Sequence, residues 1–237
     1  MPIGNIPPYE HQPGLVVAVD GPAGSGKSTA ARSVAIALGL RYLDTGSMYR
    51  ALTWWLLGQQ VDVSDPAAVV ARLAEPRIAV GTDPLAPQIQ VDGQDVARPI
   101  RTREVANSVS VVAAIPQVRQ ALIAKQREII AAAAEGAGIV AEGRDIGTVV
   151  APDAAVKVFL TASQEVRARR RSADLIADPA ATVDATLREQ ARRDERDAAQ
   201  MVMAPDAVQL DTSGLGLDEV VGRIVEMARS SRAVSRG

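Results

Sequence analysis

The chain of 237 residues carries 26 basic and 28 acidic side chains, and all the basic residues except Lys27, Lys125 and Lys157 are arginine. A formal charge of −2, 3% aromatic residues and no cysteine argue against a general nucleic-acid binder, a disulfide framework and a Cys-ligated zinc site. The single histidine, His11, lies in a proline-rich start without the pattern of a signal peptide, so we expect a cytoplasmic α/β protein without His-based catalysis.

The first predicted elements are a strand and a helix joined by a glycine-rich turn. Residues 1–13 contain four prolines and are expected to form a disordered tail. Residues 15–20 (LVVAVD) are a β-branched apolar run typical of a buried parallel strand, and residues 29–38 read as a helix that ends at Gly39. No apolar run here or later reaches the roughly 18 residues that a membrane span needs.

The turn between these elements, GPAGSGKS, fits the P-loop pattern G-x-x-x-x-G-K-[ST] in its expected strand–loop–helix context. Backbone N–H groups of such a loop surround phosphate oxygens, and the helix N-terminus adds partial positive charge. Lys27 is expected to follow the β- and γ-phosphates, and the Ser28 hydroxyl to complete a Mg²⁺ shell. The predicted ATP-binding residues are Gly21, Pro22, Ala23, Gly24, Ser25, Gly26, Lys27, Ser28 and Thr29.

A second strand, residues 41–44, precedes the segment DTGSMYR and a helix predicted over residues 47–57. This β-α-β-α opening indicates a parallel sheet with right-handed crossovers. Asp44 could serve as a general base, as a helix N-cap or as a partner of the P-loop. Arg50, on the first turns of the helix, could reach an incoming phosphate.

The sequence pattern changes in the middle of the chain. Residues 61–100 contain short strand-like pieces among turn signals and predict a small β-rich insertion. Helices are expected over residues 103–114 and 117–134, divided at Pro116. Strands at residues 139–141, 156–160 and 208–210 complete the core, and a last helix over residues 218–228 precedes a frayed end. We expect Lys125 on a solvated helix face and Lys157 within a strand.

The strand at residues 139–141 ends abruptly in Glu-Gly-Arg-Asp. In an open parallel sheet, ligands bind beyond the carboxyl ends of the strands. Glu142 is therefore placed to orient Mg²⁺ or its waters, Arg144 to face a phosphate, and Asp145 to accept hydrogen bonds. The competing interpretation, a surface Arg144–Asp145 pair in a turn, is less favoured because a P-loop is present.

Several segments together resemble the bacterial cytidylate kinase family of nucleoside-monophosphate kinases. They are GPAGSGKS, YLDTGSMYRALTW, IRTREVANSVSVVAAIPQVR, EGRDIGTVVAPDAAVKVFLTAS and the arginine-rich run that ends in RRDERD, in this order. The resemblance implies one P-loop kinase domain with a parallel β-sheet core flanked by helices. It places the core at about residues 14–46, 117–163 and 201–229, an inserted β-containing NMP-binding part at 47–116 and a helical lid at 164–200.

The resemblance also implies a reaction, in which the γ-phosphoryl group of ATP passes, with Mg²⁺, to CMP or dCMP. Ser110, Arg119 and Asp145 would bind cytosine, because an acid and an arginine suit its amino donor and its acceptors. Arg50, Arg144 and Arg193 would act in catalysis with Lys27. The implied CMP-binding residues are Thr45, Tyr49, Arg50, Arg101, Ser110, Arg119, Arg144, Asp145, Arg193 and Asp197.

This chain departs from the family pattern at the end of the lid. Arg193 and Asp197 fit the pattern, but Gln200 stands where the family has a third charged residue, an arginine, and the following stretch is about four residues shorter. Arg196 could supply the missing contact. We also expect the lid to close over ATP and exclude water, with candidate arginines at positions 167, 169, 170, 171, 193 and 196. A monomer without nucleic-acid or membrane partners is expected.

Two alternatives to this function remain. The first is a P-loop kinase that phosphorylates a hydroxyl group, with Asp44 as the base; the several arginines favour an anionic acceptor instead. The second is a nucleotide-sensing regulatory protein or GTPase-like switch. The chain has no N-K-x-D sequence, which counts against guanine specificity.

Overall fold

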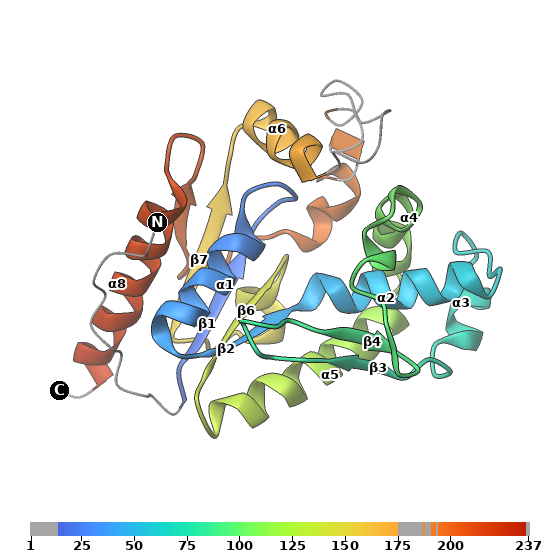
Figure 1. Ribbon diagram of the computed structural model, residues 1–237, viewed down its shortest axis with the longest axis horizontal. Helices are drawn as coiled ribbons and strands as arrows, with labels where there is room; N and C mark the ends of the chain where they lie inside the picture. Colours follow the sequence, from blue (N-terminus) through green and yellow to red (C-terminus); the bar gives the residue numbers. More distant parts are fainter. Residues whose placement is uncertain (1–13, 175–186, 188–190, 193, 236–237) are drawn as a thin grey trace.

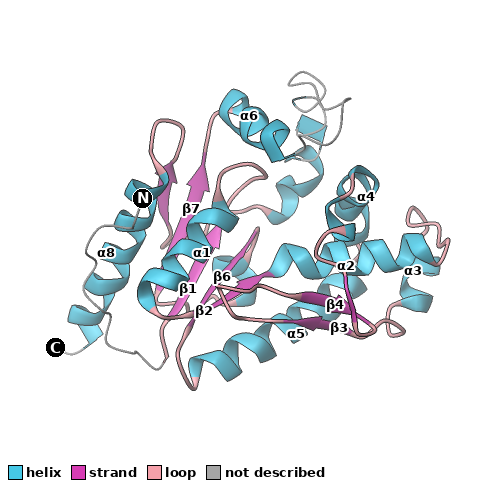
Figure 2. Cartoon of the chain, viewed as in Figure 1, coloured by secondary structure: helices cyan, strands magenta, loops and turns pink. Residues whose placement is uncertain are grey.

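The computed structural model describes residues 14–174, 187, 191–192 and 194–235. Its centre is a five-stranded sheet in which every pair of neighbouring strands is parallel (Figures 1 and 2). The strands follow the order β2 (Arg41–Asp44), β6 (Ile139–Gly143), β1 (Val16–Asp20), β7 (Val156–Thr161) and β8 (Val208–Asp211). The predicted parallel core is therefore confirmed, and the P-loop strand lies at its middle.

Helices cover both faces of this sheet because its central strands are apolar on both sides. Val17 and Val19 of β1 pack in one apolar cluster with α1 (Lys27–Leu38) and α8 (Leu217–Ser235). Ala18, between them in sequence, packs in the opposite cluster with α2 (Thr45–Gly58) and α5 (Pro116–Ala134). Helix α8 continues to Ser235, so the prediction of a frayed end after residue 229 is wrong.

The β-rich insertion is confirmed as an antiparallel sheet of β3 (Ile78–Val80), β4 (Ile89–Val91) and β5 (Gln94–Asp95). Asp92 and Gly93, both at positive φ, make the tight turn between β4 and β5. A short helix α3 (Pro66–Arg72) precedes this sheet, and a 3₁₀ turn η1 (Pro99–Arg101) leads into α4 (Arg103–Ala113).

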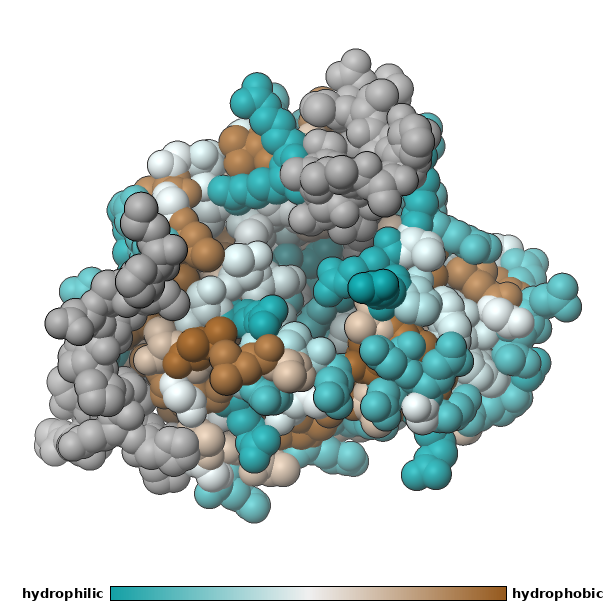
Figure 3. Space-filling view, in the orientation of Figure 1, coloured by the Kyte–Doolittle hydropathy of each residue, from teal (hydrophilic) through white to brown (hydrophobic). Residues whose placement is uncertain are grey.

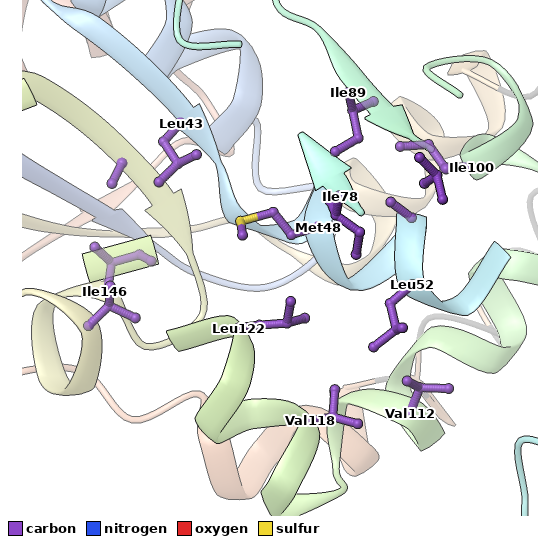
Figure 4. Close-up of a cluster of buried hydrophobic side chains, with 14 of the residues drawn as sticks. Leu43, Met48, Leu52, Ile78, Ile89, Ile100, Val112, Val118, Leu122 and Ile146 are labelled. Atoms are coloured by element: carbon purple, nitrogen blue, oxygen red, sulfur yellow. The ribbon is translucent and has the colours of Figure 1, made fainter. Parts of the chain in front are cut away.

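The insertion has no hydrophobic core separate from that of the parallel sheet. Leu43 of β2 belongs to the same buried cluster as Leu52 of α2, Ile89 of β4 and Val112 of α4 (Figure 4). The insertion is also tied to the edge strand β2, because the Tyr42 N–H donates to the Thr82 carbonyl at 2.9 Å. The two parts therefore pack as one body along α2.

The structure places Lys125 and Lys157 in different surroundings. The Lys125 ammonium on α5 donates to the carbonyl of Ile78 in β3, so the prediction of a solvated helix face is wrong. Lys157 lies in β7, as predicted, and pairs with Asp206 at 2.7 Å.

The remaining elements surround the carboxyl ends of the strands. They are a π-helical turn η2 (Ile146–Val150), helix α6 (Gln164–Asp174) and a 3₁₀ turn η3 (Ala198–Gln200). Most of the predicted lid between α6 and η3 lies outside the described residues, as do the predicted tail at residues 1–13 and Arg193. In the part of the chain that the structure describes, none of the helices combines the length and apolarity needed to cross a bilayer.

Candidate active site

The three motifs singled out in the sequence meet at the carboxyl edge of the sheet. β6 lies between β2 and β1, with Glu142 opposite Asp44 on one side and opposite Val19 on the other. The P-loop after β1, Glu142 at the end of β6 and Asp44 at the end of β2 are therefore neighbours. On the face seen in Figure 3, the molecule is hollowed near its centre, between the N-terminal end of α1 and helix α4.

The P-loop has the backbone conformation of a phosphate cradle. Gly21, Gly24 and Gly26 all have positive φ, and a Cβ at Gly21 would lie 2.1 Å from the carbonyl oxygen of Leu160. The Lys27 ammonium reaches back across the loop to the Pro22 carbonyl at 2.9 Å. Helix α1 begins with no side-chain cap and no acidic residue in its first turn, so its N-terminal N–H groups remain available to an anion.

Arginines hold the outer side of this cradle through its carbonyl groups. Arg144 donates to the Gly21 carbonyl at 3.1 Å, Arg167 to Ala23 at 3.2 Å and Arg170 to Ser25 at 3.3 Å. Thr212, after β8, also donates to the Ser25 carbonyl, at 3.0 Å. Two of the six candidate lid arginines, Arg167 and Arg170, thus lie at the P-loop. Sequence reasoning missed Thr212, which belongs to no motif.

A buried acidic centre lies beneath the phosphate cradle. The Tyr42 hydroxyl donates to Glu142 Oε1 at 2.9 Å, and the Thr45 hydroxyl donates to the backbone carbonyl of the same residue at 2.7 Å. Burial raises the pKa of Glu142, and the nearby Asp44 raises it further, whereas Lys27 and hydrogen bonds from Ser28 and Tyr42 oppose this rise. A cation at this place would favour the ionised carboxylate.

Ser28 and Glu142 fit a magnesium ion that is shared with substrate phosphates. Both offer the hard oxygen donors that Mg²⁺ prefers. A nearby cation would lower the raised pKa of Glu142 and keep its carboxylate ionised. The described residues contain no group of three or more His, Cys, Asp or Glu side chains with metal-binding geometry. Few protein ligands are typical of Mg²⁺ that is held mainly by phosphates and water.

A second group of buried polar side chains includes Asp145. Its carboxylate pairs with the Arg119 guanidinium from α5, and both side chains are largely buried. The buried Ser110 hydroxyl lacks a hydrogen-bond partner among the described residues, whereas the Gln126 amide interacts with the Tyr49 hydroxyl. Burial raises the pKa of Tyr49 to about 12. The Arg119 charge opposes this rise, Asp145 adds to it, and a hydrogen bond with Gln126 opposes it. An unpartnered polar atom in a buried place indicates a polar ligand. Gln126 was missed because a glutamine within a helix carries no motif signal.

Several predicted phosphate-binding arginines form ion pairs with carboxylates at the site. Arg50 pairs with Asp44 at 2.7 Å, and Arg144 with Asp197 at 3.2 Å. Asp44 caps α2 by accepting from the Ser47 N–H at 2.9 Å, which confirms the N-cap interpretation among the roles considered. Arg101 is exposed on η1. Gln200 donates to the Ala113 carbonyl at the end of α4, at 3.4 Å.

Asp20, which ends β1, is a further buried carboxylate that sequence reasoning missed. Its two oxygens accept the N–H groups of Ile146 and Gly147, each at 2.8 Å. Burial raises the pKa of Asp20 to about 6 against the effect of these hydrogen bonds, with a smaller contribution from Asp145. The sequence signal that could have identified Asp20 is its position directly before the first P-loop glycine.

Comparisons with known proteins agree with this arrangement. Residues 17–230 match the family described as "Cytidylate kinase". A cytidylate kinase of Streptomyces avermitilis is 49% identical over 222 residues, covering 93% of this chain and 95% of that protein. One of Rhodococcus jostii is 48% identical over 216 residues, covering 89% and 93%.

Among solved structures, an uncharacterized protein from Eubacterium ventriosum covers 92% of this chain and 99% of its own, with a TM-score of 0.50 and 11% identity. That likeness shows the fold alone. The family match and the relatives extend across nearly the whole chain and include every motif described above. The chain belongs to the cytidylate kinase family.

Proposed function

We propose that this protein is a nucleoside-monophosphate kinase that transfers the γ-phosphoryl group of ATP to CMP or dCMP, giving CDP or dCDP and ADP. One observation carries the proposal: Asp145, which pairs with Arg119 of α5, directly follows Arg144, which contacts the first P-loop glycine. A pocket for a cytosine base is thus joined directly to a cradle for ATP phosphates. The family and its curated cytidylate kinases support the same reaction.

On the donor side, the glycine-rich loop and the α1 N-terminus bind the ATP phosphates. Lys27 leaves the Pro22 carbonyl to neutralise the β- and γ-phosphates as a compact charge. Mg²⁺, held by Ser28 and by Glu142 directly or through water, supplies charge neutralisation when it is bound. Arg167 and Arg170 keep the loop in place by holding its outward-facing carbonyl groups.

On the acceptor side, the cytosine ring is recognised by charge and hydrogen-bonding pattern. The Asp145 carboxylate accepts a hydrogen bond from the exocyclic amino group. Arg119 and the Ser110 hydroxyl donate hydrogen bonds to the acceptor atoms of the ring. Uracil would present a carbonyl oxygen to the Asp145 carboxylate, which leaves both without a proton to share. This mismatch disfavours UMP.

Positioning and charge neutralisation are sufficient for the transfer step. The acceptor phosphate is already an anion, so no general base is needed. Arg50 and Arg144 exchange their carboxylate partners, Asp44 and Asp197, for the acceptor phosphate. Arg193 completes this set, with Arg101 nearby, while Thr45 and Tyr49 shape the sugar–phosphate pocket. Asp197, which pairs with Arg144 without the acceptor, contacts the sugar when the acceptor is bound.

The test is a steady-state ADP-release assay with Mg-ATP and CMP, dCMP, UMP, AMP or cytidine. We expect CMP and dCMP to support turnover and cytidine to fail. In Asp145→Asn, the ratio of kcat/KM for CMP to that for UMP should fall by a factor on the order of ten or more, because an amide can donate to uracil.

Asp153→Asn, an exposed acid in the same part of the chain, is the control and should keep the wild-type ratio. An unchanged CMP preference in Asp145→Asn would contradict the proposal that Asp145 recognises the cytosine base. Turnover with cytidine but not with CMP would instead support the hydroxyl kinase.

A further inference from the structure

Asp145 occupies an unusual place at the start of η2. It is the N-cap residue of this short helical turn, yet its side chain makes no capping hydrogen bond. Its carboxylate is turned to Arg119 instead. The first N–H groups of a helical turn have no partner within the turn and, when buried, need an acceptor from elsewhere.

That acceptor is Asp20. The Ile146 N–H donates to one carboxylate oxygen and the Gly147 N–H to the other, each at 2.8 Å, across 126 residues of sequence in the first case. Asp20 is only 6% exposed. It therefore performs the capping that an aspartate at position 145 would ordinarily perform, and the Asp145 carboxylate is left for the ligand pocket.

The same contact joins the two halves of the site. Asp20 is followed directly by Gly21, whose carbonyl accepts from Arg144 at 3.1 Å. Residues 144–147 are thus held to residues 20–21 on both sides of Asp145. Gly147 also lies close to Asp20, because a Cβ at Gly147 would be 3.5 Å from the Asp20 carboxylate.

We propose that Asp20 is the positioning residue for acceptor recognition: by capping η2 it sets Asp145 toward the base and Arg144 toward the acceptor phosphate, in a fixed position relative to the P-loop. It touches neither substrate itself and acts through these two residues. The identity of the base rests on the proposed function. The acceptor-side role of Arg144 rests on it as well, whereas the capping of η2 by Asp20 is independent of it.

Asp20→Asn tests this role because it keeps the size of the side chain but turns an N–H₂ group toward one of the two backbone donors. At pH 8, we expect KM for CMP to rise about tenfold or more and the CMP-to-UMP ratio of kcat/KM to fall. KM for ATP should change less than about threefold. Equal losses for ATP and CMP would show that Asp20 acts through the P-loop and overturn the proposal.

A merely structural role has a different signature. It would lower the melting temperature and the active fraction while both KM values and the base preference stayed at wild-type levels. Asp65→Ala, which removes the capping acceptor of the Ala67 N–H in α3 far from the site, is the control and should show only that signature. If Asp20→Asn fails to fold, Asp20→Ser keeps one acceptor without the opposed N–H₂ group, and the same acceptor-specific loss is expected.

A double-mutant cycle gives the second readout. If Asp20 works through Asp145, Asp20→Asn should reduce the CMP-to-UMP ratio much less in an Asp145→Asn background than in the wild type. Additive losses would contradict the proposal. If the wild-type protein prefers another monophosphate, the cytosine assignment fails, and the Asp20 proposal is then decided by KM for that acceptor against KM for ATP.

Discussion

The hydroxyl groups of Tyr42 and Tyr49 are both buried, but only Tyr42 donates to a charged group. Tyr42 donates to the Glu142 carboxylate at 2.9 Å, whereas the Tyr49 hydroxyl interacts with the neutral Gln126 amide. Burial and the neighbouring acids raise the pKa of Tyr42, so it remains a neutral donor. The energetic effect of losing each hydroxyl should therefore differ.

Tyr42→Phe should lower the free energy of unfolding by roughly 1–3 kcal/mol, because a buried carboxylate then loses a donor. Tyr49→Phe, the matched substitution, should lower it by less, about 1 kcal/mol or below, since the partner that is lost is a neutral amide and not a carboxylate. Urea unfolding without nucleotide measures both. Similar losses in the two variants would contradict the assigned contact between Tyr42 and Glu142.

At the scale of elements, the P-loop depends on its close packing against the neighbouring strand β7. Gly21 and Gly39 both have positive φ, but they differ in their surroundings. A Cβ at Gly21 would overlap the Leu160 carbonyl, whereas a Cβ at Gly39, after α1, would meet nothing within 4 Å. Gly21→Ala should therefore cost about 3 kcal/mol or more, and Gly39→Ala about 1 kcal/mol.

Thermal unfolding of the two alanine variants checks this difference. The Gly21 variant should also lose ATP binding, because the loop can only avoid the Leu160 carbonyl by moving. Gly39→Ala should bind ATP as the wild type does. Equal destabilisation of the two variants would mean that backbone conformation alone, and not the contact with β7, decides the cost.

Elements and motifs were predictable where the signal is local. The apolar strand 15–20, the glycine pattern after it and the acids that end β2 and β6 follow from short stretches of sequence. The capping of η2 by Asp20, the contact of Thr212 with the P-loop and the place of Lys125 depend on chain segments brought together by folding. The hydrophobic periodicity that predicts helices and strands carries no information about such contacts. Helix α8 continues to Ser235, beyond its predicted end at residue 228.

For the molecule as a whole, the shared core predicts cooperative unfolding. The insertion and the parallel sheet bury Leu43, Leu52 and Ile89 in one cluster. The two tryptophans of the chain, Trp54 and Trp55, both lie on α2 and pack against this cluster. Their fluorescence therefore reports on the insertion, while far-UV circular dichroism reports on all helices.

Unfolding curves from the two probes should coincide in urea, as expected for one cooperative unit. Leu52→Ala should shift both curves together by about 2–5 kcal/mol in free energy. A fluorescence transition that precedes the circular dichroism transition would show that the insertion unfolds by itself and that the shared cluster does not couple the two parts.

The strand order has a consequence for synthesis on the ribosome. β1 has β6 and β7 as its neighbours, and β2 pairs with β6 alone in the parallel sheet. A growing chain thus displays two apolar strands that stay unpaired until residues 139–143 have emerged between them. Such long-range pairing is slow and leaves strand edges open to chaperones and to other chains. The nascent protein carries its phosphate-binding sequence long before it has the sheet that shapes it.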